Sequence, residues 1–165
     1  MNTSEVSTPN DTSVLVKRRF DAPVKLVWRA YVEPDLFARW CTGLPGWSMP
    51  VCEMDVRTGG RYRWRWRNND DGTEFGFVGE FMEVVTESRL VHTQIYDPGN
   101  LGGSMGESQS IITVEFQESD GITHVKTTIA FASQEDRDVA LSTGMTDGME
   151  ISYKKLAEIV GGFVS

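Results

Sequence analysis

The chain has 165 residues, a length that suits one domain with a hydrophobic core that needs no disulfide or metal to hold it. Hydrophobic residues make up 39% and charged residues 24%, and the formal net charge is −8. A negative surface repels phosphate groups, so this charge argues against nucleic-acid binding and against attraction to anionic membranes.

The first twelve residues are polar and lack the apolar run of a signal peptide, and no later segment reaches the roughly 20 apolar residues of a membrane span. We therefore expect a disordered tail at 1–12 and one cytoplasmic domain at 13–165, with no membrane insertion. Cys41 and Cys52 make no disulfide framework and no CxxC pair. We expect both to be reduced, with a bridge between them as the alternative, and we expect no metal or cofactor.

The chain alternates short periodic segments with turns. Residues 13–20 are β-branched and aromatic and predict a strand. Two short helices should follow, at about 23–31 and 34–40, because each opens with a proline and carries an apolar stripe. Turns rich in Gly, Asn and Asp then separate six further strands, which we expect at 48–57, 61–67, 73–85, 89–96, 108–116 and 122–131. The Gly-rich stretch 97–106 is expected to be a mobile loop.

The clearest strand is 61–67, with the sequence RYRWRWR. Its period of two places Tyr62, Trp64 and Trp66 on one face and four arginines on the other. Phe75, Phe77 and Phe81 share one parity on the next strand. The two rows predict a continuous aromatic wall. Against the net charge of −8, the arginine row is interpreted as a solvated face paired with nearby acids rather than as a phosphate site.

A long helix is expected over 133–160. Ser133 with Asp136 three residues on resembles a capping box. Apolar residues then recur at helical spacing, including Met145 and Met149. Gly144 and Gly148 lie beside that stripe, where a helix could press close to a sheet, and Gly161-Gly162 should end the helix. The fold class is therefore α+β, with an antiparallel sheet and one long helix covering its buried face.

The order and spacing of several short motifs resemble a known family. The segment FDAPVKLVWRAYVEPDLFARW, at 20–40, is similar to the start of the family of activators of the heat-shock protein 90 ATPase, within the START-like superfamily of the birch-pollen allergen. Gly59-Gly60-Arg61-Tyr62 and the segment TGMTDGM, at 143–149, match later positions of the pattern. The likeness covers about residues 14–160. It implies a helix-grip fold, in which a bent seven-stranded sheet grips the C-terminal helix around a cavity.

Members of this superfamily bind lipids, sterols or polyketides, and some cyclise or dehydrate polyketides, so the resemblance implies a hydrophobic ligand. Ligand sites are typically concave and apolar, and methionine suits adaptable pockets. We expect the following residues to line the cavity, with plain core packing as the alternative for each: Trp40, Tyr62, Trp64, Trp66, Phe77, His92, Gln94, Met145 and Met149.

His92 and Gln94 share a strand face with Leu90, so all three point inward if Leu90 does. An inward histidine is interpreted first as a structural hydrogen-bonding group, then as a ligand contact, and last as an acid or base. No Ser-His-Asp, P-loop, GxGxxG or zinc pattern is present.

The leading hypothesis is binding of a small hydrophobic or aromatic molecule. The first alternative is an enzyme like the polyketide cyclases and dehydratases, with His92 as acid and base. The second is a chaperone-interacting module. The chaperone-activating relatives carry an additional N-terminal domain that this sequence does not contain, so this alternative ranks last. Homodimerisation stays open.

Overall fold

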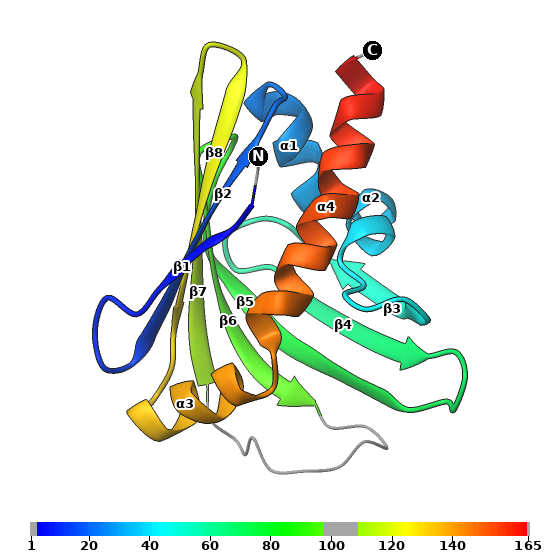
Figure 1. Cartoon of the computed structure of the whole chain (residues 1–165), viewed down its shortest axis with the longest axis vertical. Coiled ribbons are helices and arrows are strands. Elements are labelled where there is room, and N and C mark those ends of the chain that lie inside the picture. The colour runs from blue at the N-terminus through cyan, green and yellow to red at the C-terminus, as the bar shows by residue number, and fades with distance from the viewer. Residues whose placement is uncertain (1–2, 98–108, 165) are drawn as a thin grey trace.

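In the computed structural model, which describes residues 3–97 and 109–164, one curved antiparallel sheet carries the helices on its concave side (Figure 1). The strand order across the sheet is β1-β2-β8-β7-β6-β5-β4-β3. The elements of the described chain are β1 (Glu5–Ser7), β2 (Ser13–Phe20), α1 (Val24–Val32), α2 (Pro34–Trp40), β3 (Trp47–Met54), β4 (Arg61–Asn68), β5 (Glu74–Val85), β6 (Arg89–Asp97), β7 (Gln109–Ser119), β8 (Ile122–Ala130), α3 (Gln134–Ser142) and α4 (Met145–Val164).

The predicted fold class is confirmed, because the sheet and the C-terminal helix α4 stand as the helix-grip arrangement requires. The expected turns at 68–72 and 119–121 join β4 to β5 and β7 to β8. The Gly-rich stretch expected as a loop lies outside the described residues apart from Asp97, which ends β6.

One strand more than expected is present, since residues 1–12 are not simply a disordered tail. Glu5–Ser7 form β1, in which Val6 pairs with Val16 of β2. The side chains of β1 are all exposed, so the strand is held by backbone hydrogen bonds that nearly any sequence can make. It covers the backbone edge that β2 would otherwise leave open.

The expected long helix is two helices. Ser133 caps the first, α3, as predicted, with its side-chain oxygen 3.1 Å from the backbone nitrogen of Asp136. That helix ends at Ser142 because Gly144 adopts a φ of +79°, a left-handed conformation that glycine takes without strain. The second helix, α4, begins at Met145 and continues through Gly161-Gly162 to Val164, so the expectation that these glycines end it is wrong.

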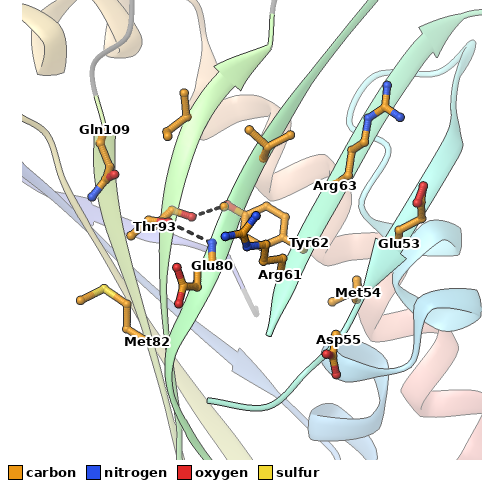
Figure 2. Close-up of a pocket in the computed structure, with 13 residues that line it drawn as sticks. Glu53, Met54, Asp55, Arg61, Tyr62, Arg63, Glu80, Met82, Thr93 and Gln109 are labelled. Carbon is orange, nitrogen blue, oxygen red and sulfur yellow. Dashed lines mark hydrogen bonds between the residues drawn. The ribbon is translucent and has the colours of Figure 1, made fainter. Parts of the chain in front are cut away.

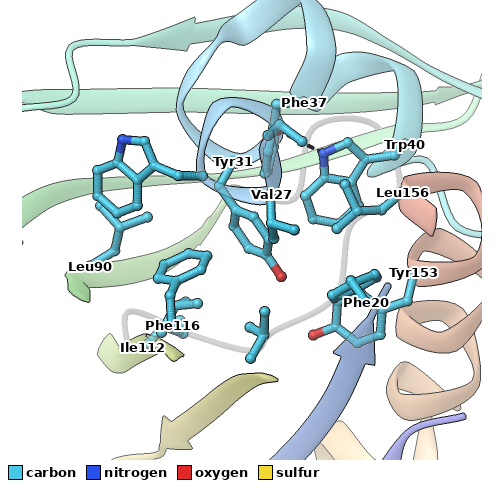
Figure 3. Packing of buried hydrophobic residues seen from close by; sticks show 14 of the residues in the cluster. Phe20, Val27, Tyr31, Phe37, Trp40, Leu90, Ile112, Phe116, Tyr153 and Leu156 are labelled. Carbon is cyan, nitrogen blue, oxygen red and sulfur yellow. Dashed lines mark hydrogen bonds between the residues drawn. The ribbon is translucent and has the colours of Figure 1, made fainter. Parts of the chain in front are cut away.

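A solid core fills one end of the space between sheet and helices. Side chains from α1 and the C-terminal half of α4 pack there against the sheet, and Figure 3 shows Tyr31 and Phe116 facing Phe20, Tyr153 and Leu156 across it. The ring of Tyr31 meets Phe116 edge to face at 5.1 Å. Leu156 is fully buried. The first turns of α4, which carry Met145, Gly148 and Met149, border a cavity instead, and this difference creates the site described next.

Candidate functional site

The aromatic wall predicted from the strand periods is present on the concave face of the sheet. In the β4–β5 ladder Trp64 lies opposite Phe77, and Trp66 lies opposite Phe75. The rings of Trp66 and Phe75 are stacked, with centroids 5.5 Å apart. Two strands with matching parity thus present one continuous apolar surface toward α4.

Between this wall and the N-terminal half of α4 lies a cavity of about 690 Å³. Its volume falls in the range of pockets that hold drug-sized molecules, about 300–1,000 Å³. The wall comes from β3 to β8, and the lid comes from α1, α2, the loop at 41–44, α3 and α4.

The structure brings together all but one of the residues expected at the cavity. Those that line it are Trp40, Trp64, Trp66, Phe77, His92, Gln94, Met145 and Met149. Trp40 also holds the lid, since its indole nitrogen donates to the carbonyl of Ala30 at 2.8 Å, the bond drawn in Figure 3.

Tyr62 is the exception and does not line the cavity. It lies opposite Gly79, where an added Cβ would come within 2.6 Å of its ring. The ring therefore sinks into the space above this glycine, and its hydroxyl donates to the carbonyl oxygen of Thr93 at 2.5 Å. It stacks on Trp64 at 4.0 Å. Tyr62 thus supports the aromatic wall from one side instead of contributing surface to it.

His92 is a buried imidazole in the cavity wall. Its Nδ1 lies 3.2 Å from the carbonyl oxygen of Thr93 and 3.2 Å from the hydroxyl of Tyr62. Since a carbonyl only accepts, Nδ1 carries the proton and Nε2 is left as an acceptor. Burial lowers the pKa of His92 to about 4, although the bond to Thr93 opposes this. His92 is therefore a neutral imidazole at pH 7.

Several polar and aromatic residues of the cavity were missed by the sequence analysis. Tyr31, Tyr153 and Thr127 contribute hydroxyl groups, and Trp47 and Tyr96 extend the aromatic lining. A signal for Tyr153 was available, since it follows Met149 by one helical turn. Tyr96 shares the strand face of Leu90, His92 and Gln94, so its direction could be predicted although it was not expected at the site. Trp47 is the first residue of β3, where the period of two has hardly begun.

The indole nitrogen of Trp64 is a buried donor with no hydrogen-bond partner among the described residues, whereas the buried hydroxyl of Tyr31 interacts with the phenol of Tyr153. Burial, with the nearby Tyr153 phenol adding to it, holds the pKa of Tyr31 well above its usual value. An unpaired buried donor such as the Trp64 indole N–H costs about 1–3 kcal/mol and is uncommon in folded proteins.

Gly148 faces the cavity from α4, and here the structure corrects an expectation. We expected Gly144 and Gly148 to allow close packing of helix on sheet. A Cβ added to Gly148 would meet no atom within 4 Å, and the same holds for Gly144. Gly148 lines the cavity, so its missing side chain adds to the open volume.

The loop between α2 and β3 is tied to α4 and forms one border of the cavity. The backbone nitrogen of Gly43 donates to the Ser152 hydroxyl at 2.9 Å, and Lys155 donates to the side chain of Thr42 and to the carbonyl of Gly43. Exposed apolar side chains stand on both sides of the cavity rim, Leu44 on the loop and Val139 on α3, with exposed fractions of 57% and 47%.

A second depression, of about 980 Å³, lies around the outward-facing side chains of β3 to β6 (Figure 2). Arg61, Arg63 and Glu53 on its rim are exposed, and Thr93 bridges its centre by accepting the backbone N–H of Glu80. A molecule placed there would keep one side in water. The less open, aromatic cavity between the sheet and α4 is therefore the better candidate site.

The remaining arginines of β4 pair with acids, in line with the solvated face that the sequence predicts. Arg65 bonds Asp97 at 2.7 Å and Glu74 at 3.4 Å, and Arg67 lies 3.6 Å from Glu74. Because these arginines are paired with acids, this part of the face offers no free cluster of cations that could bind a phosphate.

Both cysteines are free. Burial raises the pKa of Cys41 to about 12 and that of Cys52 to about 11, so neither thiol is a ready nucleophile at neutral pH. Within residues 3–97 and 109–164 no three His, Cys, Asp or Glu side chains gather as metal ligands. No helix in the same part of the chain is long and apolar enough to cross a membrane.

A curved antiparallel sheet around a C-terminal helix, with a cavity between them, defines a helix-grip domain of the START-like superfamily. Residues 21–161 match the model of the family described as activator of Hsp90 ATPase homolog 1-like protein. The chain belongs to this family.

Solved structures share this fold. A protein from Rhodobacter sphaeroides is 23% identical, with 96% of this chain and 98% of that chain covered and a TM-score of 0.84. A protein from Nitrosomonas europaea is 26% identical over 94% and 97%, with a TM-score of 0.79. An AHSA1-like protein from Aeromonas hydrophila is 22% identical over 90% and 94%, with a TM-score of 0.69. No curated protein matches the chain.

Proposed function

We propose that the protein binds a small hydrophobic molecule in the cavity between the sheet and α4. The observation that carries the proposal is the glycine at position 148, in the first turn of α4 and facing open space. A helical glycine destabilises a fold by roughly 0.5–1 kcal/mol relative to alanine. Where no neighbour requires it, its effect is to keep volume free for a ligand.

The lining supports the same function. Large aromatic side chains are prominent in it, and neighbouring strands β6 and β7 contribute the polar side chains of His92, Gln94 and Ser110. Apolar walls with a few placed polar groups are the usual composition of small-molecule sites. Such a lining suits a flat or aromatic molecule that carries a hydroxyl or carbonyl group.

The test is a titration with the neutral fluorescent dye N-phenylnaphthylamine, which brightens in apolar surroundings. We expect one saturable site per chain in the wild type. Gly148→Phe should weaken binding at least about tenfold, or 1.4 kcal/mol, by filling the cavity. Gly148→Ala is the matched control, because it adds a methyl group in the same place and should leave most of the volume open.

Equal binding to the wild type and to Gly148→Phe would place the dye elsewhere and contradict the proposal, as would no binding at all. Urea unfolding of both variants checks that each is folded before the titrations are compared.

The neutral state of His92 weighs against the alternative of a cyclase or dehydratase. A catalytic acid or base works best with a pKa near the working pH, and burial lowers that of His92 to about 4. A chaperone-interacting module and a homodimer rank below ligand binding, because both would use the outer surface and leave the cavity without a role. Free, weakly reactive cysteines suit the reducing cytoplasm, where we place the protein.

A further inference from the structure

The cavity has an uneven distribution of charge. Glu135 and Asp136 of α3 are the only charged side chains among the described residues that line it. No Lys or Arg lines the cavity in this part of the chain. Every formal charge found at the cavity is therefore negative.

The polar groups deeper in the wall are uncharged. Gln94, Ser110 and Thr127 are neutral by nature, and burial keeps His92 neutral at pH 7. They offer hydrogen bonds to a hydroxyl or carbonyl group. None of them supplies the positive charge that a buried anion needs.

Arg18 of β2 and Lys155 of α4 are engaged in bonds of their own. The guanidinium of Arg18 bonds Glu150 at 3.1 and 3.3 Å. The Lys155 ammonium donates to Thr42 and to the carbonyl oxygen of Gly43. Neither side chain is part of the lining.

We infer that the cavity selects uncharged aromatic molecules and rejects the corresponding acids, an inference that rests on the proposed function. A carboxylate or sulfonate would lose its water without gaining a partner of opposite charge, which is costly in a buried site. It would also meet the two acids of α3 and the field of a chain with a net charge of −8.

Two dyes with one skeleton test this selection. N-phenylnaphthylamine is uncharged, and anilinonaphthalenesulfonate is the same ring system with a sulfonate group. We expect the sulfonate to bind the wild type at least about tenfold more weakly. The comparison is repeated in about 1 M salt, where the screening length falls to about 3 Å and the distant net charge no longer acts. The preference should persist, since the lining itself causes it.

A pair of variants locates the source. Asp136→Asn removes one charge from the lining, and Asp138→Asn removes one from an exposed residue of the same helix that does not line the cavity. We expect Asp136→Asn to narrow the ratio of the two affinities roughly twofold or more, the scale of one nearby charge in water, and Asp138→Asn to leave it unchanged.

The outcomes separate the inference from the proposed function. Binding of both dyes with equal affinity, blocked by Gly148→Phe, would overturn the selection and keep the cavity as a binding site. A preference that vanishes in high salt, or that shifts equally in both Asn variants, would also overturn the inference. Failure of both dyes to bind would overturn the proposed function and the inference together.

Discussion

His92 connects the cavity to the pH dependence of stability. Its imidazole is buried and neutral when the chain is folded, with a pKa of about 4, whereas an unfolded histidine has a pKa of about 6.5. Between these values the unfolded chain binds a proton that the folded chain does not. Stability should therefore be fully present above pH 6.5 and fall as the pH decreases toward 4.

We predict that this difference accounts for about 3 kcal/mol of unfolding free energy between pH 7 and pH 4. Urea unfolding at half-unit steps measures it. His92→Gln should remove most of the slope in this window, because glutamine does not titrate. Identical slopes in the wild type and the variant would contradict the assignment.

Arg18 is a nearly fully buried cation on β2, with an exposed fraction of 4%. Glu150 of α4 is its partner. Burial alone would raise the pKa of Glu150, but hydrogen bonds from Ser4 and Arg18 and the charge of Arg18 hold it below its usual value. The pair joins α4 to β2, the second strand of the sheet.

Glu150→Gln should lower the free energy of unfolding by about 2 kcal/mol, because it leaves the charge of Arg18 buried without its counterion. Asp55→Asn is the control. It breaks the pair with Arg57, whose side chains are 53% and 72% exposed, and should cost less than about 0.5 kcal/mol. Chemical unfolding at pH 7 compares the two variants. Equal losses of unfolding free energy would show that the buried ion pair stabilises the fold no more than the exposed pair does.

At the scale of elements, the break between α3 and α4 decides where the cavity lies. The break redirects the chain at Gly144, so that α4 starts beside the cavity and lines it with Met145, Gly148 and Met149. The two glycines of this region therefore have different roles. Gly144 ends α3 through its backbone conformation, and Gly148 leaves volume open in the cavity.

Alanine substitutions should separate these roles. Gly144→Ala forces a side chain into a left-handed conformation and should cost about 1–2 kcal/mol. Gly148→Ala has an ordinary helical position with free space and should stabilise the fold by roughly 0.5–1 kcal/mol. Urea unfolding measures both changes, and a loss of stability in Gly148→Ala would show that a neighbour does press on this position.

The elements that the sequence could predict are those whose signal lies in side-chain periodicity. The alternation of RYRWRWR determines a strand and its two faces, and Ser133 marks the start of a helix through a local hydrogen bond. The sequence did not predict β1, because a strand held by backbone pairing alone has no pattern of side chains to recognise. The sequence did not predict the break between α3 and α4, because a single glycine is compatible both with the interior of a helix and with its end.

The candidate site follows the same division. Parity predicts which face of a strand is inward but not how deeply a side chain sits, and Tyr62 shows the difference. Its neighbour across the ladder, Gly79, offers room beneath the ring, and that pairing cannot be seen from either strand alone. Open volume beside Gly148 also depends on the distance between helix and sheet.

At the scale of the molecule, one end of the sheet is tightly packed against the helices, and the other end, the hollow end, borders the cavity. The packed end carries stability through Phe20, Phe116 and Leu156. The hollow end is bordered by the less buried lid of α3 and the loop at 41–44. The edges of the sheet are guarded, since β3 contains Pro50 and a register shift and β1 is only three residues long. Growth of the sheet by edge pairing is therefore disfavoured.

The five tryptophans test the central claim, that the cavity is a binding site, most directly. Four of them line the cavity, Trp40, Trp47, Trp64 and Trp66, whereas Trp28 packs on Phe116 in the solid core. The measurement is a nitrogen-15 NMR titration of the indole N–H signals with N-phenylnaphthylamine. We predict that the four cavity signals move and saturate together while the Trp28 signal stays in place. Unchanged cavity signals, or equal shifts in all five, would contradict the account.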